Sequence, residues 1–124
     1  PIPKIDKPGQ IPFERIVSYL LWLKKHGISD SNDELMFRYF EQILDGMVFE
    51  AYLPEIIENA ELYFRKHMSE FPNISNSKNV LEDLRSLFVK IYQPSHPLKY
   101  AVSQLSSIPE IKTVLDKQKK KENK

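Results

Sequence analysis

The chain has 124 residues, a formal net charge of +1 and no cysteine, and its length predicts a single domain. Without cysteine it can form neither disulfides nor zinc–thiolate sites, and no apolar run approaches the roughly 20 residues that span a bilayer. The first ten residues lack the apolar segment of a secretory signal. We therefore expect a cytoplasmic protein that does not contact the membrane.

The charges are unevenly distributed along the chain. Residues 30–61 contain nine acidic residues against Arg38 alone, a local charge of −8, whereas residues 117–124 contain five lysines against Glu122, a local charge of +4. A surface as acidic as the middle of the chain repels phosphate. Contacts with nucleic acid are therefore expected only from the two ends.

The N-terminal part predicts an arm and a helix. The prolines and glycine of residues 1–11 favour an extended arm that ends in a turn at Pro8-Gly9. A helix from Pro12 to His26 should follow, because proline suits a first helical position and Gly27 suits a left-handed C-cap. The expected inner face of this helix comprises Phe13, Ile16, Val17, Leu20, Leu21 and Leu23, with Trp22 at its margin.

The stretch from Ser31 to Leu53 predicts the longest helix. Its apolar residues occur as neighbouring pairs four positions apart, the pattern of a broad buried face: Leu35/Met36, Tyr39/Phe40, Ile43/Leu44, Met47/Val48 and Ala51/Tyr52. Ser31 and Glu34 form an S-x-x-E capping box, and Pro54 should end the helix.

Gly46 lies within this helix, at a cost of about 1 kcal/mol relative to alanine. One interpretation is a tolerated glycine at the helix margin. Its place beside Met47 on the buried edge instead favours a close helix crossing, with another backbone lying against it. The neighbouring Asp45 either reaches solvent or bonds donors at the start of another helix.

The remaining pattern predicts shorter helices. One should run from Pro54 to Phe71, one from about Lys78 to Tyr92 and one from Pro97, while residues 109–116 favour a last helix over an extended segment. The lysine-rich residues 117–124 should be disordered. The expected fold is all-α, an irregular bundle of about five helices over residues 12–116, with the arm at 1–11 and the tail at 117–124.

Chemical motifs are scarce in the sequence. Gly9, Gly27 and Gly46 are isolated and build no phosphate-binding loop, and the three histidines His26, His67 and His96 match no zinc spacing. Glu110-Ile111-Lys112 matches the E-x-K of metal-dependent nucleases, but the upstream acidic partner that holds the metal is missing. We expect no catalytic residue, metal or cofactor in this chain.

Three segments together resemble a known family. They are IPKIDKPGQIPFERIVSYLLWLKK (residues 2–25), FEQILDGMVFEAYLPEII (residues 40–57) and HPLKYAVSQLSSIPEIKTVLD (residues 96–116). In this order they resemble the C-terminal end of TaqI-like, type IIG restriction-modification proteins. Those are large bacterial proteins that join an adenine-N6 DNA methyltransferase to a target-recognition region and often to a nuclease. Residues 72–92 lie outside the resemblance.

The resemblance implies motif positions and a structural function. The positions are Asp45, Val48, Phe49, Glu50 and Tyr52 in the second segment and His96 and Pro97 in the third, with Lys99 at an arginine position. Phe49 replaces a tyrosine and Ala51 a leucine of the family pattern. The methyltransferase motif Asn-Pro-Pro-aromatic is absent, so S-adenosylmethionine is expected only in a parent methyltransferase.

On this resemblance the chain is a non-catalytic C-terminal module that braces the recognition region, and its partner is the rest of the parent protein. DNA phosphates are possible contacts through the parent, with Lys4, Lys7, Arg15, Lys24, Lys25 and Lys99 as candidates. The alternatives are a free-standing helical domain that binds another protein or itself, and a small nuclease built on Glu110 and Lys112. The sequence favours no oligomeric state.

Overall fold

The computed structural model describes residues 7–28, 30–59, 61–68, 70–105 and 107–108, without the side chains of residues 7–11 and 65. Within these ranges every regular element is helical, which confirms the predicted irregular all-α bundle. The α-helices are α1 (Lys7–His26), α2 (Ser31–Tyr52), α3 (Pro54–Asn59), α4 (Val80–Ile91) and α5 (Pro97–Leu105), and two 3₁₀ turns are η1 (Arg65–His67) and η2 (Ile74–Asn76). The predicted arm over residues 1–6, the predicted helix at 109–116 and the tail at 117–124 lie outside the described residues.

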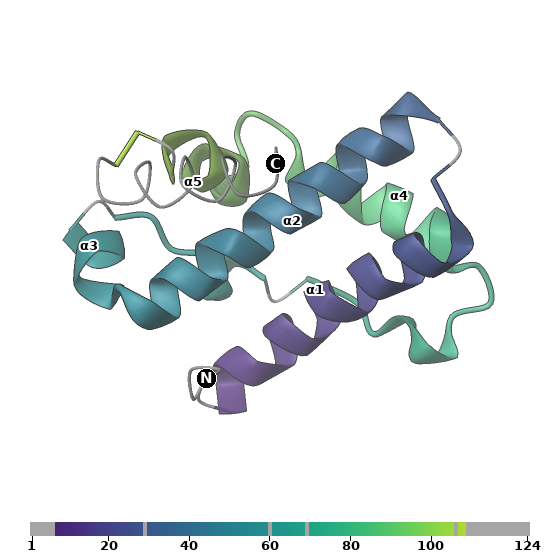
Figure 1. Cartoon of the computed structure of the whole chain (residues 1–124), viewed down its shortest axis with the longest axis horizontal. Coiled ribbons are helices and arrows are strands. Elements are labelled where there is room, and N and C mark those ends of the chain that lie inside the picture. Colours follow the sequence, from purple (N-terminus) through teal and green to yellow (C-terminus); the bar gives the residue numbers. More distant parts are fainter. Residues whose placement is uncertain (1–6, 29, 60, 69, 106, 109–124) are drawn as a thin grey trace, which may run out of the picture.

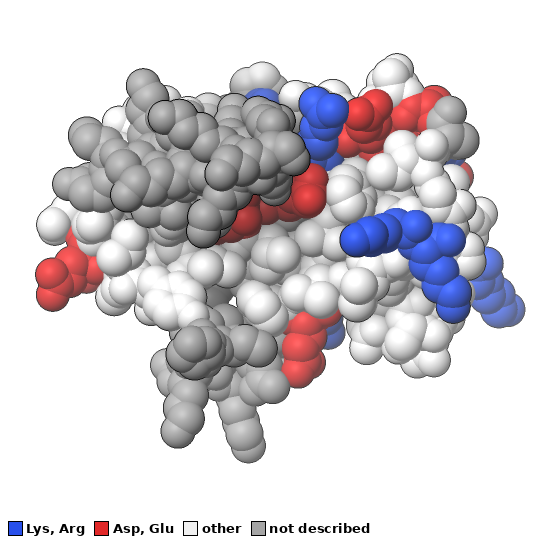
Figure 2. Space-filling model, viewed as in Figure 1, with Lys and Arg blue, Asp and Glu red and all other residues white. Residues whose placement is uncertain are grey.

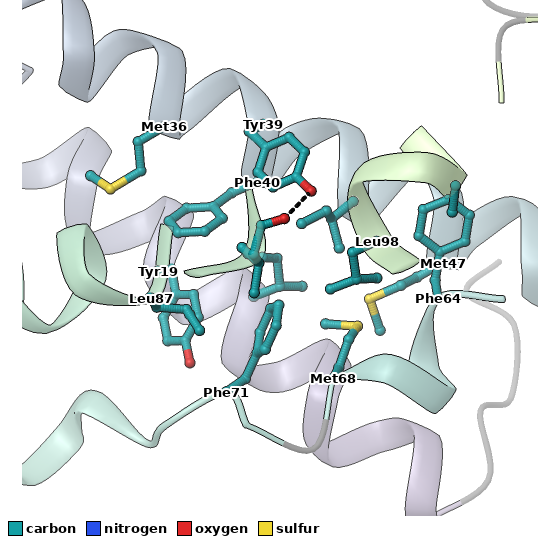
Figure 3. Packing of buried hydrophobic residues seen from close by; sticks show 14 of the residues in the cluster. Tyr19, Met36, Tyr39, Phe40, Met47, Phe64, Met68, Phe71, Leu87 and Leu98 are labelled. Atoms are coloured by element: carbon teal, nitrogen blue, oxygen red, sulfur yellow. Dashed lines mark hydrogen bonds between the residues drawn. The ribbon is translucent and has the colours of Figure 1, made fainter. Parts of the chain in front are cut away.

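Helix α2 spans the molecule, and the other helices are arranged around it (Figure 1). Helix α1 packs along α2 in the opposite direction, and α3, α4 and α5 also contact α2. The core between them is mixed aliphatic and aromatic, and Figure 3 shows Met47 of α2, Leu98 of α5 and Met68 of the segment after α3 close together. Its fully buried members include Ile16, Tyr19, Met36, Phe40, Ile43, Met47, Phe64, Leu84, Ile91 and Leu98.

Helix α1 begins earlier than the sequence predicts. It starts at Lys7, so the expected turn at Pro8-Gly9 is wrong and residues 7–11 are helical. Pro8 is compatible with this start because the amides of a first helical turn have no intrahelical partner. The predicted end is correct: Gly27 has φ +84° and donates its N–H to the Leu23 carbonyl at 3.0 Å.

The N-cap of α2 is Asp30 and not the predicted Ser31. The Asp30 carboxylate accepts a hydrogen bond from the Asp33 N–H at 2.7 Å. Both residues are good N-caps, and aspartate has the additional advantage of a negative charge at the positive end of the helix dipole. The predicted end before Pro54 is correct, since Leu53 is the C-cap.

The third predicted helix stops much earlier than Phe71. Helix α3 ends at Asn59, and Glu61 follows with φ +57°. The Leu62 N–H bonds the Ile57 carbonyl and the Glu61 N–H bonds the Glu58 carbonyl, each at 3.0 Å. This pair of bonds is a Schellman motif, which ends a helix with one left-handed residue. No glycine marks the position in the sequence.

The helices predicted from about Lys78 to Tyr92 and from Pro97 are present as α4 and α5. Asn79 caps α4 with its side-chain oxygen, and Pro97 is the first residue of α5. Three residues predicted to lie on inner faces are instead exposed: Leu21 at 63%, Leu35 at 42% and Tyr52 at 52%. They lie at the edges of their apolar stripes, where the neighbouring helix no longer covers them.

Candidate functional site

Glu50 is the best-buried charged residue at a motif position. It lies on α2, is 8% exposed, and its carboxylate accepts a hydrogen bond from the Phe64 N–H at 3.0 Å. The segment after α3 has left helical geometry at this point, so its amides need partners outside the segment. Glu50 therefore fastens residues 61–68 to α2.

Gly46 lies one turn before Glu50 and completes this attachment. The fully buried Phe64 ring lies so close to Gly46 that an added Cβ atom would collide with it. The close approach inferred from the sequence is therefore present, but an aromatic side chain approaches Gly46 where another helix backbone was expected. The Phe64 position is thus fixed twice, by its amide on Glu50 and by its ring on Gly46.

The other α2 motif positions divide between core and surface. Phe49 is buried at 8% exposure, Val48 is half-buried, and Tyr52 and Asp45 are exposed. Of the two interpretations of Asp45, the exposed side chain agrees with the one in which it reaches solvent. These residues do not converge on a single pocket.

His96 and Pro97 form the start of α5. The Leu98 N–H donates to His96 Nδ1 at 3.1 Å, so the imidazole caps the helix while that nitrogen is unprotonated. Leu98 is fully buried, and the cap therefore places α5 on the core. Burial lowers the pKa of the nearby His67 below its ordinary value, and the charges of Lys66 and His96 act in the same direction while Glu50 opposes them.

Two of the residues predicted to contact phosphate make contacts within the fold instead. The Arg15 guanidinium donates to the Phe71 carbonyl at 2.6 Å, and the Lys99 ammonium lies 3.8 Å from the centre of the Tyr92 ring. Both side chains are half-buried and take part in the fold.

Among the described side chains of the predicted set, the exposed ones are Lys24 and Lys25, in the last turn of α1. Lys4 and the side chain of Lys7 lie outside the described part of the chain. In the view of Figure 2, Lys and Arg side chains gather mainly toward the end where α1 leads into α2. The negative end of the helix dipole is favourable for cations, but it does not attract phosphate.

An ion pair that the sequence did not reveal joins α2 to α4. Arg85 donates to both carboxylate oxygens of Asp33, at 2.9 and 2.7 Å, and Asp33 is only 4% exposed. These hydrogen bonds hold the pKa of the Asp33 carboxyl below its ordinary value, although burial opposes them. The two residues are 52 positions apart, so local spacing gave no signal for the pair.

Two buried tyrosines also bind distant backbone. The Tyr39 hydroxyl donates to the Ile91 carbonyl at 2.7 Å, as the dashed line in Figure 3 shows, and the Tyr19 hydroxyl donates to the Pro72 carbonyl. Burial raises the pKa of both phenols. Both tyrosines therefore belong to the core and also donate a hydrogen bond. The spacing of apolar residues in the sequence does not predict such a bond.

A groove of about 620 Å³ lies beside the turn between α1 and α2. Ile28 and Phe37 form its apolar part, and Asp30, Glu34, Arg38 and Glu41 supply its charges. Arg38 pairs with Glu34 at 2.8 Å across one helical turn. The groove is open and shallow, and its charged groups are typical of a binding surface more than of an enclosed reaction site.

Among the described residues, no three His, Asp or Glu side chains are grouped closely enough to hold a metal ion. Glu110 and Lys112, the E-x-K pair, lie outside these residues. No helix in the described ranges is long and apolar enough to cross a membrane. Comparison of the chain with protein-family models, with curated proteins and with solved structures gave no match.

Proposed function

We propose that this chain is a non-catalytic helical module from the C-terminus of a bacterial restriction-modification DNA methyltransferase. In this function it braces the target-recognition region of the parent protein. The parent would act in the cytoplasm and bind S-adenosylmethionine in a different part of its chain. The proposal rests on the three segments that resemble the type IIG family.

The observation that carries the proposal is the packing of these segments around α2. The first segment includes α1, the second covers the later part of α2 and the start of α3, and the third includes α5. Helices α1, α3 and α5 each contact α2. Segments that are far apart in the sequence thus make one packed unit, as expected if the resemblance reflects a shared fold.

The bonds of Glu50 and His96 also support a bracing function. Each accepts a hydrogen bond from a backbone N–H, Glu50 from Phe64 and His96 from Leu98. The Glu50 bond fixes the segment after α3 to α2, and the His96 bond caps the start of α5, so both order the unit. A rigid unit is what a brace requires.

The reading frame upstream of Pro1 tests the proposal most simply. We expect it to encode an Asn-Pro-Pro-aromatic motif and a glycine-rich cofactor motif in the same polypeptide. In that parent, Gly46→Leu should reduce DNA methylation because the brace is distorted, whereas Val89→Ser, at a 61% exposed position on α4, should not. A frame without methyltransferase motifs would contradict the proposal.

Phosphate contact by the module is a separate part of the proposal. If Lys24 and Lys25 touch DNA, replacing both by glutamate should weaken binding of a labelled duplex without changing sequence preference. The slope of affinity against salt should fall by about 2. Lys90→Glu on α4 is the matched control. Binding that is the same in all three proteins would leave the module with bracing alone.

The alternative is a free-standing helical domain that binds another protein or a second copy of itself. It is supported by the apolar and acidic groove at the α1–α2 turn. Sedimentation of the isolated chain tests for the homodimer. If the chain dimerises, the apparent mass should rise with protein concentration above the 14.6 kDa of one chain.

A further inference from the structure

Helix α5 begins with a cap whose chemistry differs from the caps of α2 and α4. The N-caps of those two helices are Asp30 and Asn79, whose side-chain oxygens accept backbone N–H groups. At the start of α5 the acceptor is instead the Nδ1 atom of His96, 3.1 Å from the Leu98 nitrogen. An imidazole ordinarily gains a proton between pH 8 and 5, so this cap depends on pH within that range.

The first turn of α5 depends on His96 for its hydrogen bonds. Pro97 has no N–H group, and the N–H groups of Lys99 and Tyr100 both reach the His96 carbonyl, at 3.1 and 3.3 Å. The Leu98 N–H bonds the imidazole. Because Leu98 is fully buried, this bond lies at the point where α5 enters the core.

A proton on His96 Nδ1 would turn this acceptor into a donor. The Leu98 N–H would then face a second N–H group, and its hydrogen bond would be lost. In addition, the imidazolium charge would lie at the positive end of the α5 dipole, where a cation is unfavourable. Both effects oppose the capped start of α5, and together they amount to the removal of an N-cap.

His67 of η1 lies close enough to His96 for their charges to interact. Burial lowers the pKa of His67 below its ordinary value, the charges of Lys66 and His96 act in the same direction, and Glu50 of α2 opposes them. On α5 itself, Lys99 places its ammonium 3.8 Å from the centre of the Tyr92 ring. A proton on His96 would therefore add to the positive charges of Lys66 and Lys99.

Helix α5 is attached to the bundle by one apolar face. Its nine residues include three buried ones, Leu98, Ala101 and Leu105, and it contacts α2 and α4. Figure 3 shows Met47 of α2 and Met68 of the segment after α3 close to Leu98. A short helix held by a few apolar contacts can open locally while the rest of a domain stays folded.

We infer that the start of α5 is a pH-sensitive switch, in which a proton on His96 removes the cap and α5 opens from α2 and α4 while the rest of the bundle stays folded. Opening uncovers Leu98 and the neighbouring Met47 and Met68. Acid conditions would thus present an apolar surface that is closed at neutral pH. The switch goes beyond the proposed function, because it is a property of the chain itself and does not depend on a parent protein.

Amide hydrogen exchange of the full 124-residue chain tests the switch. Protection factors, corrected for the exchange rate of an unstructured peptide at each pH, are measured by NMR at pH 7.5 and 5.5. The ratio of the protection of Ala101 and Val102 in α5 to that of Ile43 in α2 separates local opening from unfolding of the whole chain. We expect this ratio to fall about five- to tenfold at pH 5.5, which corresponds to the loss of one N-cap.

Variants of His96 identify the trigger. Asparagine caps a helix well and gains no proton in this range, so in His96→Asn the ratio should change by less than about twofold. His96→Lys places a permanent cation at the cap and should give the low ratio at both pH values. The matched controls are His67→Gln, beside the cap, and His26→Gln, at an exposed position of α1, and both should keep the fall. Circular dichroism verifies that each variant is folded.

The inference is overturned if the ratio does not fall in the unchanged chain, if His96→Asn shows the same fall, or if His67→Gln abolishes it. Protection of Ile43 that falls as much as protection of α5 would mean that acid unfolds the whole chain, and would also overturn it. The upstream reading frame bears on the proposed function alone. A frame without methyltransferase motifs would refute that function while the exchange result still reported on α5.

Discussion

The two long sides of α2 carry similar apolar residues but are used differently. On the inner side the hydroxyl of Tyr39 and the carboxylate of Glu50 each bond distant backbone, and Gly46 receives the Phe64 ring. On the outer side Phe37 and Leu44 are half-buried beside exposed carboxylates. Hydrophobicity alone does not separate the sides. The inner side is distinguished by polar groups that find backbone partners within the fold.

The largest expected effect comes from filling the space at Gly46 on the inner side. Gly46→Leu should lower the free energy of unfolding by about 3 kcal/mol, because the added side chain must displace the buried Phe64 ring. The melting temperature should fall by about 10 °C. Thermal unfolding followed by circular dichroism measures both changes.

Phe64→Leu provides the control for the Gly46 prediction. If the ring is the obstacle, Gly46→Ala should destabilise the Phe64→Leu background less than the unchanged chain, which a double-mutant cycle resolves. Equal effects in both backgrounds would show that Phe64 does not fill the space over Gly46.

Removing the Glu50 acceptor should have the next largest effect. Glu50→Ala leaves the buried Phe64 N–H without a partner and should cost about 1 to 3 kcal/mol. Glu50→Gln keeps a side-chain oxygen at this place and should cost less. Urea unfolding compares the two variants. A glutamine variant as unstable as the alanine variant would mean that the negative charge, and not the hydrogen bond, holds the segment.

The sequence predicted most of α1, α2, α4 and α5 because their apolar spacing and end signals are local. It failed after Asn59, where the helix is ended by Glu61 in a left-handed conformation that glycine normally adopts. The attachment of this segment depends on Glu50 and Phe64, 14 positions apart, and periodicity does not report such a contact.

The candidate site was less predictable than the fold. The resemblance identified Glu50 and His96 as motif positions. The backbone N–H groups that they bind are known only from the structure. In the sequence, Arg15 and Lys99 were candidates for phosphate contact. In the structure, Arg15 donates to a carbonyl and the Lys99 ammonium lies over an aromatic ring. The outer side of the α1–α2 pair was hidden for a different reason. Val17, Leu21, Leu44 and Val48 were predicted to be core and Phe37 was left out of the predicted stripe, because a stripe gives no sign of where the neighbouring helix stops.

A smaller effect is expected from His67, whose titration should make the free energy of unfolding depend on pH. Burial lowers the pKa of His67 below its ordinary value of 6.5, so the folded chain binds its proton less readily than the unfolded chain. The contribution of neutral His67 to the free energy of unfolding is therefore complete above pH 6.5. It is lost as the pH falls through the lowered pKa of His67.

His67→Gln should remove this component. The difference in unfolding free energy between the unchanged chain and His67→Gln, measured by urea unfolding at several pH values, should therefore decrease as pH falls below 6.5. A difference that is constant from pH 8 to 5, or that grows toward low pH, would contradict the assigned burial of His67.

The smallest effect on stability is expected at Leu21 on α1. Leu21→Ser should change the free energy of unfolding by no more than about 0.5 kcal/mol, as Val89→Ser on α4 should, because both positions are mainly exposed. Urea unfolding of the two variants checks this. A much larger loss for Leu21→Ser would mean that the chain itself covers Leu21.

Cysteine accessibility tests the difference between the two sides most directly, because the chain contains no cysteine of its own. Leu21→Cys places a single thiol at an exposed position of α1, and Ala101→Cys places one on α5, where the native residue is 1% exposed. The thiol at position 21 should react with a maleimide almost as fast as a free cysteine, whereas the thiol at 101 should react only through unfolding. Equal rates at the two positions, or slower reaction at 21, would contradict an exposed outer side at Leu21 beside a packed inner side.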